Sequence, residues 1–185
     1  MIKRRKPPIK VEELSADSAR FVRDLQRETD RGVALAGAAF VADALRALIN
    51  AAFVNDIEIA ERLLDGERPL GTMSARIDIA YALGLIGPDM RRQANILRQI
   101  RNSFAHEHQP ADLAAPGLKS AVDGLRIYLK PLERLENANP RSVVVMTIIL
   151  LTNHLLLRAL STRHVAFGDD FRVTNRPVPT TVTKI

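Results

Sequence analysis

The chain has 185 residues, 46% of them hydrophobic, which is enough for one domain with a sizeable core. It contains no cysteine, which excludes disulfides, thiol catalysis and cysteine-based zinc sites and is compatible with a cytoplasmic location. The net charge of +6 arises at the two ends, because the segment from Val11 to His164 carries 19 basic and 19 acidic residues. A DNA-reading domain carries its basic excess on the folded body, so direct sequence-specific DNA binding is doubtful.

The two ends of the chain are predicted to be tails. Residues 1–10 contain five basic residues and no acid, and they form either a solvated, flexible arm or an electrostatic contact to nucleic acid or an acidic partner. Residues 165–185 contain two prolines and a glycine and show no periodicity. We therefore expect a single domain over residues 11–164.

Apolar residues recur with helical spacing throughout this domain, and no strand alternation is visible. Helices are predicted over about residues 12–28, 31–53, 56–64, 73–85 and 88–106, after Gly117, and over 141–163. Asp30 is a plausible N-cap of the second helix. The fold class is therefore all-α, a single compact bundle of about six to seven helices.

The most apolar stretch, Val143 to Leu151, is too short to span a membrane, which needs about twenty apolar residues. We read it as part of a buried helix and expect no membrane association. Because the helix over 141–163 is apolar nearly all round, it serves either as a core strut or as an oligomer face.

The helix over 88–106 carries an apolar stripe at spacings of three and four. Its members are Met90, Ala94, Leu97, Ile100 and Phe104. On an ideal wheel Arg101 falls inside this stripe, and a buried guanidinium must be paired. Two interpretations stay open: a buried Arg101 that ties two helices together, with Asp78, Glu28, Asp30 or Asp43 as partner, or a functional site. The opposite face (Arg91, Asn95, Arg98, Asn102) is either solvated or in contact with phosphates.

The helix over 73–85 is apolar nearly all round, which is typical of a central helix. Arg76 and Asp78 are its exceptions, and each needs a partner if it is buried. The predicted polar cluster, of structural or functional importance, comprises Glu28, Asp30, Arg31, Arg76, Asp78 and Arg101.

Several chemical motifs are missing from the sequence. It has no Gly-rich phosphate loop, no His-Glu-x-x-His and no nucleophile elbow. His106 and His108 are too close together at a helix end to form a strong metal pair, so we expect no metal and no cofactor. No helix pair has the pattern of a helix-turn-helix reader.

Three sequence blocks resemble the mannitol operon repressor family. They are Glu28-x-Asp30-Arg31-Gly32-x-Ala34-Leu35, then Arg68 to Ile86 with Ser74-Ala75-Arg76-Ile77-Asp78 at its centre, and then Ile100-Arg101-Asn102-x-Phe104-Ala105-His106. The resemblance covers about residues 12–160. It implies an all-helical transcriptional regulator of a sugar-alcohol operon, dimeric, acting through a protein partner rather than through a DNA-reading motif, and not an enzyme.

The last block is also similar to the Arg-polar-x-x-x-His motif of HEPN domains, many of which are metal-independent ribonucleases. The alternative function is therefore an endoribonuclease acting on RNA. In it Arg101 stabilises the developing phosphorane charge, His106 transfers protons, and Asn102 orients either Arg101 or His106. Residues five apart point roughly 140° from each other on a regular helix. Arg101 and His106 can therefore converge only if the helix distorts or if two subunits meet.

Overall fold

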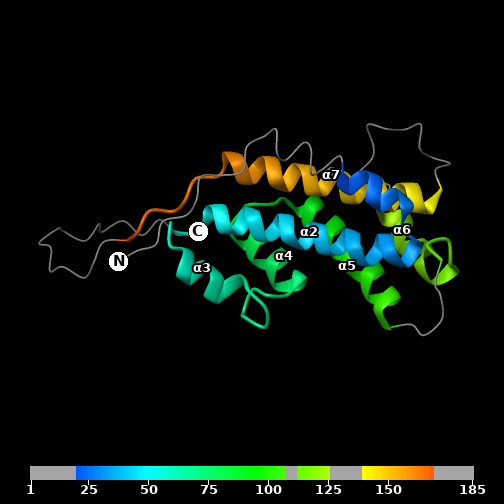
Figure 1. Cartoon of the computed structure of the whole chain (residues 1–185), viewed down its shortest axis with the longest axis horizontal. Coiled ribbons are helices and arrows are strands. Elements are labelled where there is room, and N and C mark those ends of the chain that lie inside the picture. The colour runs from blue at the N-terminus through cyan, green and yellow to red at the C-terminus, as the bar shows by residue number, and fades with distance from the viewer. Residues whose placement is uncertain (1–19, 107–111, 126–138, 169–185) are drawn as a thin grey trace, which may run out of the picture.

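The computed structural model describes residues 20–106, 112–125 and 139–168. Helical residues 20–27 are followed by six helices (Figure 1): α2 (Asp30–Ala52), α3 (Ile57–Leu64), α4 (Met73–Ala82), α5 (Pro88–His106), α6 (Pro116–Leu125) and α7 (Pro140–Ser161). Within these ranges there is no strand. The predicted all-α fold is confirmed.

The two longest and most apolar helices, α2 and α7, lie side by side and run in the same direction (Figure 1). A contact between Asp30 and Arg141 joins the first turns of the two helices, and the N–H of Val165 donates to the carbonyl of Ala52, the last residue of α2, at 3.0 Å. Gly37 makes close packing possible, because a Cβ there would lie 2.2 Å from Cδ1 of Ile148. This parallel pair is the spine of the bundle.

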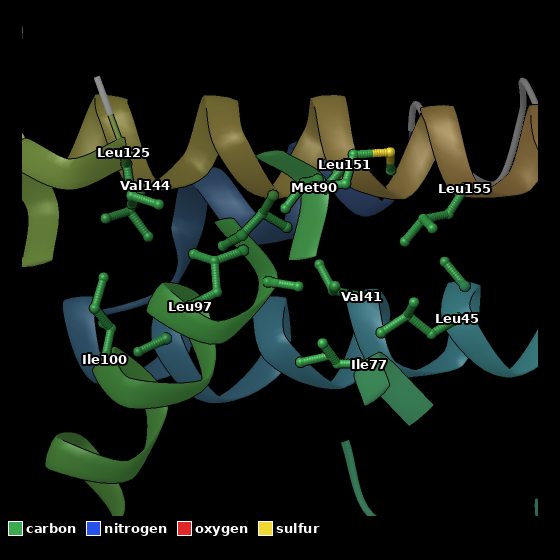
Figure 2. Packing of buried hydrophobic residues seen from close by; sticks show 14 of the residues in the cluster. Val41, Leu45, Ile77, Met90, Leu97, Ile100, Leu125, Val144, Leu151 and Leu155 are labelled. Atoms are coloured by element: carbon green, nitrogen blue, oxygen red, sulfur yellow. The ribbon is translucent and has the colours of Figure 1, made fainter. Parts of the chain in front are cut away.

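Three other helices, α4, α5 and α6, cover the spine with apolar faces. α4 and α5 pack against α2, and α6 packs against α5 and α7. Figure 2 shows Val41 and Leu45 of α2, Leu97 of α5 and Leu151 of α7 pointing into one shared interior. The predicted stripe of α5 (Met90, Ala94, Leu97, Ile100, Phe104) is buried throughout, as its spacing indicated.

Helix ends follow local side-chain chemistry, with one correction. The N-cap of α2 is Thr29, whose hydroxyl accepts from the N–H of Gly32 at 3.1 Å, and Asp30 is the first helical residue instead. Thr72 caps α4 in the same way through the N–H of Ala75. α4 ends at Ala82, three residues earlier than expected, and Gly84 then takes a positive φ of 67° that favours glycine.

Only part of the predicted division into two tails and a domain falls on residues that the structure describes. Residues 1–10 lie outside the described residues, as does the chain from residue 169 onward. The first residues of the predicted C-terminal tail are described, and the backbone of Val165 is hydrogen-bonded to the end of α2. By length and composition α2 and α7 could each cross a membrane, but each packs one face against the other helices, as core helices do.

Candidate functional site

A cleft of about 630 Å³ opens between the middle of α2, the start of α4 and the last turns of α5. Its floor is made of short side chains of α2, namely Ala38, Ala39 and Ala42 with Leu35 beside them. The N-terminal segment of α4 forms one wall, with Gly71, Thr72, Met73 and Ser74. Arg98, Arg101 and Asn102 of α5 form the other. Two of the three residues of the Arg-polar-x-x-x-His motif therefore lie at this cleft.

Arg101 is exposed, which contradicts the prediction of a buried guanidinium. Its Nη1 donates to Oδ1 of the neighbouring Asn102 at 3.1 Å. The expected partner, Asp78, binds Arg91 instead, at 3.2 Å between Nη2 and Oδ1. Although the backbone of Arg101 lies beside the apolar stripe, the long side chain carries its charged end out to solvent. The prediction of a buried Arg101–Asp78 pair is therefore wrong.

The ribonuclease geometry depends on His106, the last residue of α5. Its side chain lies outside the described residues. α5 is regular α-helix from Pro88 to His106, so the distortion that would bring positions 101 and 106 to one side of the same helix is not present. Convergence of these positions within one subunit therefore has no support in the backbone.

Among the described residues, Arg76 is the arginine that the fold buries. It is only 7% exposed, and its guanidinium donates to the carbonyls of Leu70, Ala42 and Leu64 at 2.9, 3.0 and 2.9 Å. It thus joins α2, the end of α3 and the loop before α4. Burial lowers the pKa of Arg76, and the carboxylate of Asp43 at 3.8 Å opposes this effect. Arginine nonetheless stays charged in proteins.

Asp30 belongs to a second, separate group. Its Oδ1 accepts from Arg141 at 2.7 Å and its Oδ2 from the N–H of Leu113 at 3.1 Å. Burial alone would raise the pKa of Asp30, but the hydrogen bonds from Arg141 and Leu113 and the positive charge of Arg141 outweigh it, so the pKa lies below its usual value.

The six residues of the predicted polar cluster do not form one site. Glu28 and Arg31 are exposed beside Asp30, Arg76 is buried under α2, Asp78 pairs with Arg91, and Arg101 lies at the cleft. Sequence reasoning missed Arg141. One signal was present: Arg141 is the only Lys, Arg, Asp or Glu between Pro140 and Leu157, in a helix that is otherwise apolar.

Metal-binding groups are sparse in the part of the chain that the structure describes. There, no three His, Asp or Glu side chains come together in a way that could hold a metal ion. The chemistry that the cleft offers is instead that of two guanidinium groups, an amide and a helix start above an apolar floor.

Comparison with known proteins shows which proteins this chain resembles. A family model described as mannitol repressor matches residues 23–158. A chain of the X-ray structure of the MtlR–HPr complex from Escherichia coli is similar in fold, with a TM-score of 0.61 and 22% identity over 76% of this chain and 98% of that chain. A search of curated proteins found no match. Because the family model covers most of its length, the chain belongs to the mannitol repressor family.

Proposed function

We propose that this chain regulates transcription of a sugar-alcohol operon by binding a protein partner, and that this partner is HPr. The observation that carries the proposal is the fold shared with almost the whole of a chain whose structure was solved as an MtlR–HPr complex. Family membership supports the regulatory role. Because a regulator of transcription acts in the compartment that holds the DNA, a cytoplasmic location is part of the proposal.

Action through a partner, rather than by reading DNA, is supported by charge and by the placement of α5. The segment from Val11 to His164 has equal numbers of acidic and basic residues. In a helix-turn-helix reader the first residues of the second helix contact base edges. Here Arg91, at the start of α5, is engaged within the protein by Asp78 and lies 4.5 Å from the ring centre of Tyr81.

We also propose that the protein has no catalytic activity. The ribonuclease alternative requires Arg101 and His106 to act together, and the uninterrupted helix between them offers no such convergence within one chain. RNA incubated with the wild-type protein is therefore expected to stay as intact as RNA incubated with Arg101→Ala/His106→Ala. Cleavage of RNA by the wild type but not by the double variant would contradict this proposal and support the ribonuclease function.

A homodimer built on the outer face of α7 is the third part of the proposal. Met146 and Leu157 are 36% and 59% exposed there, and no Lys, Arg, Asp or Glu lies between Ser142 and Leu157. A two-fold interface brings the same surface together with itself, so an uncharged apolar face avoids like-charge repulsion. The expected occupant of this face is a second copy of the chain.

Calorimetric titration with HPr from the same organism tests the partner. Saturable binding to HPr, together with weak DNA binding, is the expected result. No heat with HPr, combined with tight operator binding that falls steeply with salt, would show that the protein reads DNA directly.

Light scattering after size exclusion tests the dimer. Leu157→Glu is expected to give a monomer that keeps its helical circular dichroism. Ile59→Glu is the matched control, because Ile59 is 39% exposed on α3, away from the proposed face. A monomeric wild type, or equal dissociation by both variants, would contradict an interface on α7.

A further inference from the structure

The cleft between α2, α4 and α5 has the size and the lining of a small-molecule site. Its volume of about 630 Å³ falls within the range of roughly 300–1,000 Å³ that metabolite and drug pockets occupy. The sequence keeps it open, because three of the four α2 residues that line it are alanines (Ala38, Ala39 and Ala42) and Leu35 is the one longer side chain among them. Gly71 contributes no side chain, and only glycine fits there, because a Cβ at this position would lie 1.8 Å from the carbonyl oxygen of Gly66.

The polar groups of the cleft gather on one wall. Arg98, Arg101 and Asn102 are spaced three and four residues apart on α5, so they share one helix face. Nε of Arg98 donates to Oδ1 of Asn95 at 3.3 Å, and Arg101 donates to Asn102. These acceptors are neutral amides. Among the described residues no carboxylate lies within 4.0 Å of either guanidinium, although Arg46, Arg76, Arg91 and Arg141 each have one.

This difference separates the cleft arginines from arginines with a structural role. Each guanidinium carries five N–H donors whose geometry matches a planar or tetrahedral oxyanion, and most of these donors have no acceptor among the residues that the structure describes. Arg98 is half-buried against the cleft and Arg101 is exposed at its rim. The first turn of α4 also lines the cleft, and although Thr72 caps the N–H of Ala75, the partial positive charge of the helix N-terminus favours an anion as well.

We infer that the cleft binds a small metabolite bearing a phosphate monoester. Arg98 and Arg101 hold the phosphate dianion from the α5 side, and the amide of Asn102 and the hydroxyl of Ser74 are placed for hydroxyl groups of the ligand. The carbon skeleton lies over Ala38 and Ala39. This inference does not depend on the proposed homodimer, since no residue of α7 lines the cleft.

Titration calorimetry with glycerol 3-phosphate and with inorganic phosphate, at matched ionic strength against sulfate and chloride, tests the inference. We expect the ester to bind more tightly than inorganic phosphate, because the cleft floor contacts its carbon chain, and sulfate to bind more weakly than both. Arg98→Met and Arg101→Met are each expected to weaken ester binding about tenfold or more.

Arg92→Met is the matched control, since Arg92 is exposed on the same helix but does not line the cleft. It is expected to leave the affinity unchanged. Ala39→Leu, which extends a side chain from the cleft floor, is expected to weaken the ester more than inorganic phosphate. Each variant is checked for an unchanged melting temperature.

Three results would overturn the inference. The first is an ester affinity no higher than that for sulfate. The second is an equal loss on Arg92→Met and Arg98→Met, which would indicate a general counterion effect. The third is displacement of the ester by a short RNA oligonucleotide that binds more tightly through the same two arginines, which would make the cleft a nucleic-acid contact.

Discussion

Asp30 and Arg141 form an ion pair at 2.7 Å although 111 residues separate them in the chain. The same separation recurs at the other end of the spine, where Nδ1 of His164 lies 2.7 Å from the carbonyl oxygen of Phe53. α2 and α7 are therefore parallel and in register, and the Asp30–Arg141 pair fixes the end at which both begin. Arg141 also donates to the backbone carbonyls of Leu25 and Glu28, which closes the turn before α2.

Replacing Arg141 with Met should lower the free energy of unfolding by about 1.5–3 kcal/mol, the range for hydrogen bonds to charged groups. The change removes the partner of Asp30 and leaves carbonyls at the end of residues 20–27 without their donor. Urea unfolding at neutral pH measures the loss. Asp24→Asn is the control, because the Arg20–Asp24 pair is 79% and 65% exposed and at 3.9 Å should contribute almost nothing. Equal effects from the two changes would contradict a structural role for Arg141.

The Asp30 pair also predicts a pH dependence. Its folded-state pKa is depressed, so the carboxylate stabilises the fold above its unfolded pKa of about 3.9. That contribution is lost as the pH falls through the lower, folded-state pKa. The stability difference between the wild type and Asp30→Asn should therefore be largest near neutral pH and shrink below about pH 4. A difference that stays constant down to acid pH would show that the charge of Asp30 is not what stabilises the contact.

Arg76 and Arg101 should behave in opposite ways when each is replaced with Met. Removing Arg76 takes the side-chain donor from the carbonyl of Leu64 at a buried site and from the part-buried carbonyl of Leu70, and we expect a loss of about 3 kcal/mol or more. Arg76→Lys should recover only part of it, because an ammonium group cannot reach three separate carbonyls in the fork geometry. Arg101→Met should change stability by less than about 0.5 kcal/mol, as expected for an exposed side chain. Thermal unfolding of the three variants checks this order, and a reversed order would contradict it.

Local spacing predicted the helices and the buried stripe of α5, because a period of 3.6 residues fixes which side chains share a face. The same wheel misplaced Arg101. It describes where a Cα lies, whereas a long side chain beside an apolar stripe can still carry its charge to water. The N-cap was misplaced by one residue, since Thr29 and Asp30 are both good caps and the backbone decides between them.

Long-range partners could not be read from local pattern. The three carbonyls that hold Arg76 come from α2, the end of α3 and the loop before α4, and they converge only after these segments have packed. The cleft depends on three elements as well. Its arginines were visible in the sequence as a polar helix face, but the alanines opposite them were not recognisable as a cleft floor until α2 and α5 were placed together.

Gly37 and Ile148 provide a sharp test of how closely α2 and α7 pack. A Cβ at position 37 would lie 2.2 Å from Cδ1 and 3.0 Å from Cγ1 of Ile148, a side chain that is only 1% exposed. Gly37→Ala gains up to about 1 kcal/mol of helix propensity, but overpacking costs about 1–3 kcal/mol, so we expect a net loss of stability.

Ile148→Val removes the Cδ1 atom that conflicts with a Cβ at position 37. In that background Gly37→Ala should become neutral or stabilising, and a double-mutant cycle by urea unfolding should give a coupling energy above about 0.5 kcal/mol. Gly117→Ala in the first turn of α6 is the control, since nothing lies within 4 Å of its added Cβ. It should be neutral or stabilising in both backgrounds. Additive effects of the changes at positions 37 and 148 would mean that the two helices are not in the close contact that their shared register requires.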